Sequence, residues 1–303
     1  MTTLPVNKNE PGDYSDIIAA IQSGQVVTYL GPGALYDVKH LQTGDAMPAD
    51  SDSLILAMNG GRPMSPRLMY EFPRAAMDME LKKGRSFVSR FLEQTYSDTQ
   101  WSRAAIHDWL ATLKPHYVID VNRDTQLQDS YADTPHLLVR GIARIGGTDY
   151  RFRLHHYDGK RYHELHDPAW ADTSLPILLK PMGSPSPEPT FIASDADYVD
   201  YITELMGGFG LPAFLKEYRK GKQYLFIGLP LSRDTERMVM SDIIYASGEP
   251  AGWALIEQPT AKEVRFCAKM NIEIINASVA GFLQAIGYAG SAEKAHQRQQ
   301  IAG

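Results

Sequence analysis

The chain has 303 residues, of which 44% are hydrophobic and 22% charged, a composition typical of a globular protein with a sizeable core. Its formal net charge is −6 and it has no basic run, which argues against nucleic acid or an anionic membrane surface as the main partner. No segment approaches the roughly eighteen consecutive apolar residues of a membrane span, and the first residues lack the apolar core of a signal peptide. We therefore expect small molecules or proteins as ligands and a cytoplasmic location.

The only cysteine of the sequence is Cys267. Internal disulfides and a cysteine-based zinc ribbon are therefore excluded. Its neighbours Phe266 and Ala268 favour a buried thiol on a strand.

The N-terminal third predicts a helix, a strand and a glycine turn, followed by a helical stretch. A helix is expected over Tyr14–Ser23, and the strand Val26–Leu30 runs directly into Gly31-Pro32-Gly33. After a polar stretch rich in Gly and Pro, apolar spacing predicts three helices, at Arg67–Lys83, Arg85–Tyr96 and Trp101–Leu113. Pro115 ends the third helix, and His116–Val121 reads as a short buried strand.

The middle of the chain predicts a β-hairpin. Asp158-Gly159 lies between two aromatic, alternating runs, which favours a type I′ turn. With Tyr157 opposite Lys160, His156 and His163 would be diagonal neighbours on one face.

The remaining sequence alternates short apolar runs with helical patterns. The strands are expected at Pro176–Lys180, Tyr224–Leu229, Trp253–Glu257 and Ile272–Asn276, and the helices at Asp195–Glu204, Leu211–Arg219, Asp234–Tyr245 and Ser278–Ile286. This order predicts an α/β, Rossmann-like fold with a mostly parallel sheet covered by helices.

We expect a single domain over residues 14–290. It carries a helical insertion at about 66–113 and the β-hairpin at about 137–166. Residues 1–13 are expected to be a flexible N-terminus and residues 291–303 a C-terminal tail.

In an open parallel sheet, ligands bind beyond the carboxyl ends of the strands. The predicted strand ends carry Gly31-Pro32-Gly33, Asn122-Arg123-Asp124, Met182-Gly183-Ser184, and Gly228 with Ser232. A glycine turn lets backbone N–H groups approach a phosphate, but the third glycine of the dinucleotide fingerprint is missing. Asn122 and Asp124 also suit an Asx turn or a helix cap.

The combination is more specific than its parts. The order runs from a helix, a strand and G-x-G to a strand ending in N-x-D, then K-x-x-G after a third strand, and a strand ending in Gly. It resembles the SIR2-like (sirtuin-type) family, in its bacterial branch without the zinc module. The segments that carry the resemblance are VVTYLGPGAL, LMYEFPRAAMDMELKKGRSFVSRFLEQTYSD, HDWLATLKPHYVIDVNRDTQL, LLKPMGSP, FIASDADYVDYI, LFIGLPLSRDTERMVMSDI and NIEIINASVAGFLQAI. They span about residues 14 to 287 and cover the hairpin poorly.

The resemblance implies a site for NAD or ADP-ribose at these strand ends. Asn122 and Asp124 would take the positions beside the nicotinamide ribose. The nucleotide-binding residues implied by the resemblance are Gly31, Gly33, Ala34, Gly183, Ser184, Gly228 and Ser232. No metal site is implied.

This sequence departs from the family pattern at its reactive positions. Met182 stands where the family has a histidine that acts on a ribose hydroxyl, and a thioether is a poor proton acceptor. Pro32 and Leu35 replace an alanine and a serine of the glycine turn, which removes a backbone donor and a hydroxyl. The resemblance therefore favours the fold and the pocket over full catalytic function.

Other polar groups have plain structural interpretations. The hairpin histidines, which are His155, His156, His163 and His166, are candidates for a substitute base or a metal site, although a solvated hairpin is favoured. His107 and His116 read as surface residues. Arg233-Asp234 and Glu236-Arg237 are expected to cap and pair along a solvent-facing helix, although Arg233 is also a candidate for contact with a phosphate.

Two functions of different classes follow. The first is a nucleotide-binding protein that is catalytically impaired and acts through NAD or ADP-ribose binding or through protein contacts. The second is an active NAD glycohydrolase, similar to bacterial antiphage SIR2-like proteins, in which Asn122 acts with another base. By family analogy we also expect a regulatory protein partner and a homo-oligomer.

Overall fold

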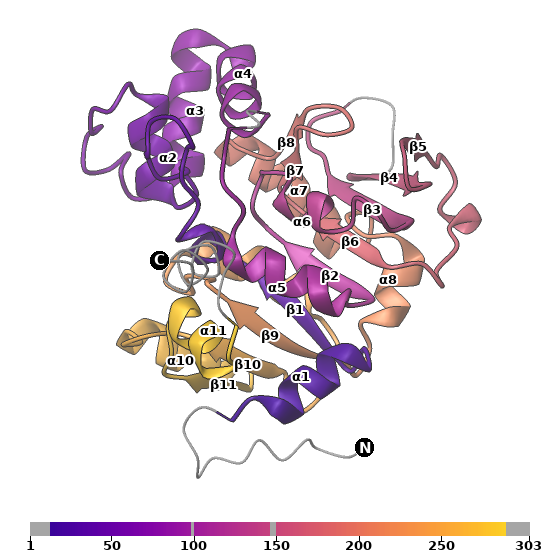
Figure 1. Ribbon diagram of the computed structural model, residues 1–303. Coiled ribbons are helices and arrows are strands. Elements are labelled where there is room, and N and C mark those ends of the chain that lie inside the picture. Colours follow the sequence, from indigo (N-terminus) through magenta and orange to yellow (C-terminus); the bar gives the residue numbers. More distant parts are fainter. Residues whose placement is uncertain (1–12, 98–99, 146–149, 289–303) are drawn as a thin grey trace, which may run out of the picture.

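Figure 1 shows a computed structural model, and we describe its residues 13–97, 100–145 and 150–288. The predicted N-terminal segment, apart from residue 13, and the predicted tail lie outside the described residues. The α-helices are α1 (Ser15–Gln22), α2 (Ser51–Met58), α3 (Phe72–Lys83), α4 (Arg85–Tyr96), α5 (Ala105–Leu113), α6 (Gln126–Ser130), α7 (Asp195–Met206), α8 (Ala213–Tyr218), α9 (Asp234–Ile243), α10 (Ala261–Lys269) and α11 (Val279–Ala285). The strands are β1 (Val26–Leu30), β2 (Tyr117–Asp120), β3 (His136–Gly141), β4 (Phe152–Tyr157), β5 (Tyr162–Glu164), β6 (Ile177–Lys180), β7 (Gly183–Ser184), β8 (Thr190–Phe191), β9 (Gln223–Ile227), β10 (Gly252–Leu255) and β11 (Ile272–Ile275).

Nine strands form one sheet in the order β11-β10-β9-β1-β2-β6-β3-β4-β5. The pairs from β11 to β3 are parallel, and only β4 and β5 run antiparallel to their neighbours. This confirms the predicted α/β fold with a mostly parallel sheet. The two residues of β7 pair with β8 in a separate ribbon.

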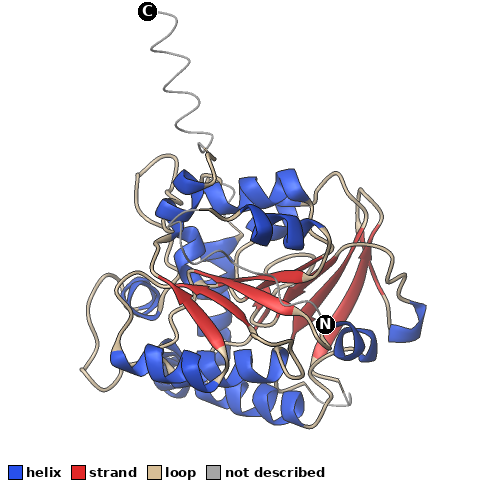
Figure 2. Cartoon of the chain, turned by 90° about the horizontal axis from the view of Figure 1, so that it is seen from below, coloured by secondary structure: helices blue, strands red, loops and turns tan. Residues whose placement is uncertain are grey.

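Helices cover both faces of the sheet (Figure 2). Alternate residues of β1 point to opposite faces, so Val26 and Leu30 join one hydrophobic cluster while Val27 and Tyr29 join another. The first cluster packs under α1, α5, α11 and the helical group α2–α4, and the second under α7–α10. Every residue of β1 and β9 is buried, as their apolar runs predict.

The register aligns the carboxyl ends of the central strands. Leu30 at the end of β1 pairs with Asp120 of β2 and with Ile227 of β9, and Leu255 of β10 pairs with the same Ile227. The loops that follow these strands therefore meet along one edge of the sheet, which we call the carboxyl edge.

The structure corrects several predictions. Cys267 is buried, as expected, but in helix α10, which begins with a capping box between Thr260 and Glu263. Helix α3 begins at Phe72, because Pro73 fits its first turn. His107 is fully buried in α5 and is not a surface residue.

The hairpin also differs in its turn. Tyr157 pairs with Tyr162, so four residues from Asp158 to Arg161 form the connection and His156 lies directly opposite His163. The Asp158 carboxylate accepts hydrogen bonds from the N–H groups of Lys160 and Arg161, which favours this longer turn over the predicted type I′ turn.

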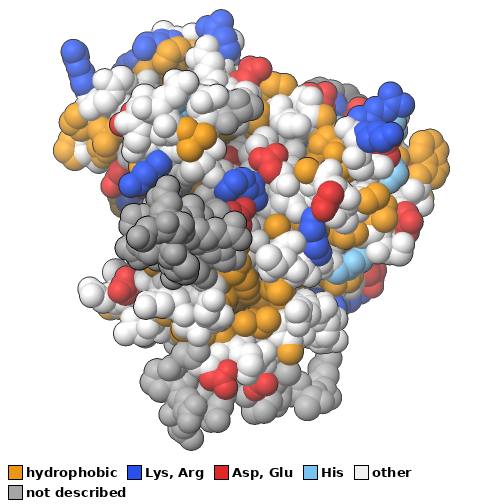
Figure 3. Space-filling model, viewed as in Figure 1, with side chains coloured by type: hydrophobic (Ala, Val, Ile, Leu, Met, Phe, Trp, Pro, Cys, Tyr) orange, Lys and Arg blue, Asp and Glu red, His pale blue; other side chains and the backbone are white. Residues whose placement is uncertain are grey.

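Within the described residues, no helix has both the length and the apolar character needed to cross a membrane. On the face drawn in Figure 3, acidic and basic side chains are interspersed around apolar patches.

Candidate functional site

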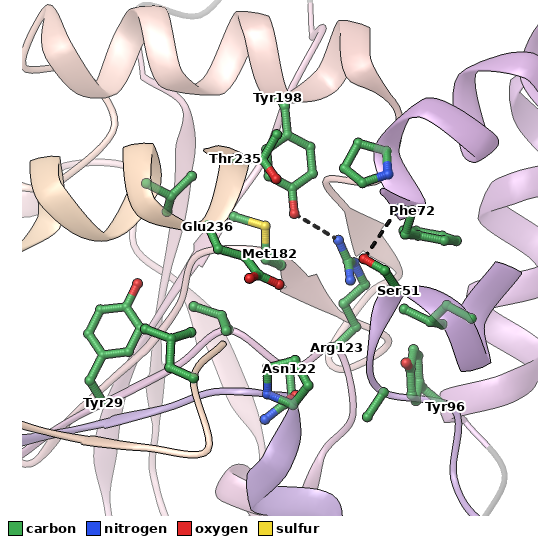
Figure 4. Close-up of a pocket in the computed structure, with 17 residues that line it drawn as sticks. Tyr29, Ser51, Phe72, Tyr96, Asn122, Arg123, Met182, Tyr198, Thr235 and Glu236 are labelled. Atoms are coloured by element: carbon green, nitrogen blue, oxygen red, sulfur yellow. Dashed lines mark hydrogen bonds between the residues drawn. The ribbon is translucent and has the colours of Figure 1, made fainter. Parts of the chain in front are cut away.

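A small cavity lies at the carboxyl edge, where the loops after β1, β2, β6 and β9 meet the helical group α2–α4 (Figure 4). We call it the inner cavity; its volume is about 40 Å³. A water molecule needs roughly 10–15 Å³ by the same measure, so the inner cavity has room for a few waters. Its polar lining includes Tyr29, Ser51, Tyr96, Asn122, Arg123, Tyr198, Thr235 and Glu236, and Met182 also lines it.

Asn122 is held in one orientation at the floor of this cavity. Its Nδ2 donates to Asp120 Oδ1 at 2.8 Å and to the Gly31 carbonyl oxygen at 2.9 Å. Since both partners are acceptors, the amide nitrogen is assigned by the network, and the Asn122 Oδ1 is the group left for a ligand or water.

A buried ion pair fixes the carboxylate that holds Asn122. Lys180 Nζ lies 2.8 Å from Asp120 Oδ2, and both side chains are fully buried. Asp120 Oδ1 also accepts the backbone N–H of Asn122 at 3.0 Å. Although burial alone would raise it, the charge of Lys180 and contact with His107 hold the pKa of Asp120 below its ordinary value. Asp120 is therefore a carboxylate that fixes the loop carrying Asn122.

His107, Asp120 and Asp124 bring three potential metal-ligand atoms within 4.8 Å of one another. His107 Nε2 lies 3.6 Å from Asp120 Oδ2, and neither ring nitrogen has a hydrogen-bond partner among the described residues. The Lys180 ammonium already contacts that carboxylate oxygen. We interpret the group as a charge network in which Lys180 supplies the positive charge.

Met182 lines the inner cavity with its side chain 3% exposed. The resemblance predicts that it stands at the family's base position, and the structure brings it into the same cavity as Asn122 (Figure 4). Arg123, which follows Asn122, also lines the cavity, and its guanidinium donates to the Ile192 carbonyl oxygen and the Tyr198 hydroxyl.

A larger hollow of about 480 Å³ adjoins the inner cavity and shares Pro32, Ala49 and Leu229 with it. We call it the outer hollow. Residues after β1, β9, β10 and β11 line it, including Gly33, Gly228, Glu257 and Ser278. Its volume falls within the roughly 300–1,000 Å³ range of small-molecule sites.

The glycines of the first turn serve close packing against the end of β9. The N–H groups of Gly31 and Gly33 donate to the carbonyl oxygens of Ile227 and Gly228, and Ala34 N–H donates to Gly31. A Cβ on Gly31 would lie 2.5 Å from the Leu229 Cα. These N–H groups are thus engaged within the protein, while the turn brings its backbone to the rim of the outer hollow.

The other predicted site residues lie elsewhere. Asp124 lines a third hollow of about 430 Å³ with Ser186 and with Tyr96, which also lines the inner cavity, and its Oδ1 accepts the Gln126 N–H in an Asx turn. Gly183 and Ser184 form the β7–β8 ribbon. Among the described residues, Gly31, Ala34, Gly183, Ser184 and Ser232 do not line the inner cavity, the outer hollow or the Asp124 hollow.

Sequence reasoning missed Glu236 as a site residue. It lies in the first turn of α9, and its carboxyl group points into the inner cavity (Figure 4). Arg237 pairs with Asp234, but the partly buried Glu236 lies on the face of α9 that carries its buried residues. Its spacing from Val239, Met240 and Ile243, at three, four and seven residues, is the signal that finds it. Burial, with the nearby charge of Glu71, raises the pKa of Glu236 to about 8.

A protein-family model described as the SIR2-like domain matches residues 113–275, which is more than half of the chain. The chain belongs to the SIR2-like family. The matched segment of this SIR2-like chain contains Asn122, Met182, Gly228 and Glu236, whereas the glycine turn at Gly31 and the helical group α2–α4 precede it. No curated protein sequence matches the chain.

Proposed function

We propose that this SIR2-like protein binds an NAD-type nucleotide at the carboxyl edge, with the ADP-ribose part in the outer hollow. One observation carries the proposal: the outer hollow lies at the ends of β1, β9, β10 and β11 and joins the cavity that holds Asn122 and Met182. Membership of the SIR2-like family supports an NAD-related role.

The lining of the outer hollow suits the adenosine end of such a ligand. Glu257 follows β10 and its carboxylate is exposed. In many dinucleotide sites a carboxylate accepts hydrogen bonds from the ribose hydroxyls. Leu229, Leu255 and Val279 offer apolar surface for a base. Arg123 puts positive charge at the inner cavity, toward the reactive end.

The reactive end is narrow and has lost the family's base. The inner cavity admits a few waters but not a nicotinamide riboside, so its lining side chains must move before that group enters. With Met182 in place of a histidine, binding is the function proposed first, and any cleavage of NAD depends on a proton acceptor other than residue 182. Hydrolysis to nicotinamide and ADP-ribose is the second candidate, and the carboxyl group of Glu236 in the inner cavity favours it. The regulatory partner, the homo-oligomer and a role in antiviral defence stay predictions from the family.

Calorimetry with ADP-ribose and with NAD tests the binding proposal. We expect micromolar binding by the wild type, a loss of at least about tenfold in Glu257→Ala, and no change in Glu217→Ala. Glu217 is an exposed carboxylate on α8 that pairs with Lys220 and gives a matched control. Absence of binding to both ligands would refute the proposal.

A further inference from the structure

We propose that Glu236 supplies the proton acceptor that this SIR2-like chain lacks at Met182, and that the protein hydrolyses NAD through it. The inference rests on the proposed binding of an NAD-type nucleotide at the carboxyl edge. It assigns a residue on α9, outside the N-x-D and K-x-x-G segments, to the chemistry at C1′ of the nicotinamide ribose.

The first support is position. Glu236, Met182 and Asn122 line one cavity, and in the view of Figure 4 the Glu236 carboxyl group is drawn between the Met182 sulfur and Asn122. The Asn122 carbonyl oxygen is left as an acceptor by the two hydrogen bonds of its amide nitrogen. In the proposed mechanism a water in the inner cavity contacts this amide oxygen and the Glu236 carboxyl group together.

The second support is the lack of another role for this carboxyl group. The Glu236 Oε2 is buried and makes no hydrogen bond with any described residue. A buried carboxylate oxygen without a partner costs free energy, so fold stability alone does not account for it. The helix itself is capped by a different residue, because Glu71 Oε1 accepts the Asp234 N–H at 3.1 Å.

The third support is the charge around it. Groups from six elements or loops face Glu236. Those of largest effect are Glu71 before α3, Arg233 before α9, Arg123 after β2 and Asp50 before α2, and the hydroxyls of Tyr29 in β1 and Tyr198 in α7 also lie nearby. Burial and Glu71 raise the pKa of Glu236 to about 8, near the operating range of a general base at neutral pH.

The step balances as a hydrolysis. Glu236 accepts a proton from water while the water oxygen bonds to C1′ of the nicotinamide ribose. The C1′–N bond breaks, and its electron pair stays on the ring nitrogen, so nicotinamide leaves neutral. The products are nicotinamide and ADP-ribose, and the proton passes from Glu236 to solvent.

The test measures nicotinamide release from NAD by chromatography between pH 6 and pH 9, with ADP-ribose calorimetry on the same proteins. We expect the wild-type rate to rise with pH as one group deprotonates and Glu236→Gln to lower kcat by roughly 10²- to 10⁴-fold. ADP-ribose affinity should stay within about threefold of wild type, since Gln preserves size and removes only the charge. Equal rates in wild type and Glu236→Gln would overturn the inference.

A second variant, Glu71→Gln, tests whether the pH dependence of the rate comes from Glu236. Gln keeps the oxygen that caps α9 but removes the charge, so the rise in rate should move to lower pH while the plateau is kept. A ¹³C NMR titration of labelled glutamate carboxyl groups should show one resonance titrating near pH 8, absent in Glu236→Gln and shifted to lower pH in Glu71→Gln. An unshifted rate profile and resonance in Glu71→Gln would contradict the assignment.

Failure of the two proposals can be told apart. ADP-ribose binding without NAD cleavage by the wild type would overturn the role of Glu236 and leave the binding function intact. Absence of ADP-ribose binding would overturn both.

Discussion

The two hollows at the carboxyl edge are built in different ways. The outer hollow, of about 480 Å³, is shaped by backbone that packs closely, as glycines at the ends of β1 and β9 contact each other. The inner cavity, of about 40 Å³, is lined by polar side chains fixed by charge, with the Asp120–Lys180 pair beneath Asn122. If the proposed function holds, the outer hollow supplies the shape for binding and the inner cavity the charges for chemistry. Substitutions can then change one without the other.

The largest effect is expected from the ion pair under the inner cavity. Lys180→Met leaves the Asp120 carboxylate buried without its partner, which typically costs about 3–5 kcal/mol of unfolding free energy. Lys82→Met is the control, because Lys82 pairs with Asp78 at the surface and should lose less than about 1 kcal/mol. Urea unfolding measures both. A loss below about 1 kcal/mol in Lys180→Met would show that the pair does not support the cavity.

The inner cavity should also make stability depend on pH. Glu236 has a higher pKa folded than its ordinary value of 4.5, so the folded chain binds this proton more tightly than the unfolded chain. Its stabilising contribution is complete below about pH 4.5 and is lost as pH rises through about 8.

We therefore expect the stability of wild type relative to Glu236→Gln to fall by roughly 2–4 kcal/mol between pH 5 and pH 9, at about 1.4 kcal/mol per pKa unit. Urea unfolding at pH 5, 7 and 9 measures this difference, with Glu217→Gln as an exposed control. A difference that stays constant with pH would show that the folded chain does not raise the pKa of Glu236.

Alanine substitutions at two glycines with the same backbone conformation test whether close packing shapes the outer hollow. Gly228 and Gly44 have φ of +64° and +76°, so alanine strains both alike. A Cβ at Gly228 would lie 2.5 Å from the Ala34 backbone nitrogen, while one at Gly44 meets nothing within 4 Å. Gly228→Ala should therefore cost about 1–3 kcal/mol more than Gly44→Ala and weaken ADP-ribose binding. Similar losses in the two variants would mean that the close contact does not shape the hollow.

The parts predicted from sequence are those with a local signal. Val26–Leu30 and Arg85–Tyr96 form where an apolar run and a helical spacing predict them. The Asp120–Lys180 pair joins residues sixty positions apart, and its prediction requires knowing that β2 and β6 are neighbours.

Glu236 was missed for a different reason. Its charge and its neighbour Arg237 suggested a solvent face, whereas its spacing from Val239 and Met240 places it on the apolar face of α9. The charge of Glu236 was the weaker signal. Burial on an amphipathic helix depends on whether a residue lies on its apolar face, whatever the residue type. A charged residue that is spaced with the apolar face of a helix, when that helix follows a strand, is therefore a candidate site residue.

The smallest effect is expected from the hairpin histidines, which the sequence offered as substitute bases. Strands β6, β3 and β4 separate β5 from β2 in the sheet, so at roughly 4.8 Å per strand His163 lies about 19 Å from the Asn122 loop. His163 is half-exposed and contacts Asp158 within its own turn, and burial lowers the pKa of His155 to about 3, which makes it a weak base. His163→Gln should change unfolding free energy by less than about 0.5 kcal/mol and leave NAD cleavage unaltered. If His163→Gln abolished cleavage while Glu236→Gln did not, the base would come from the hairpin, and the charge lining the inner cavity would serve only to position Asn122.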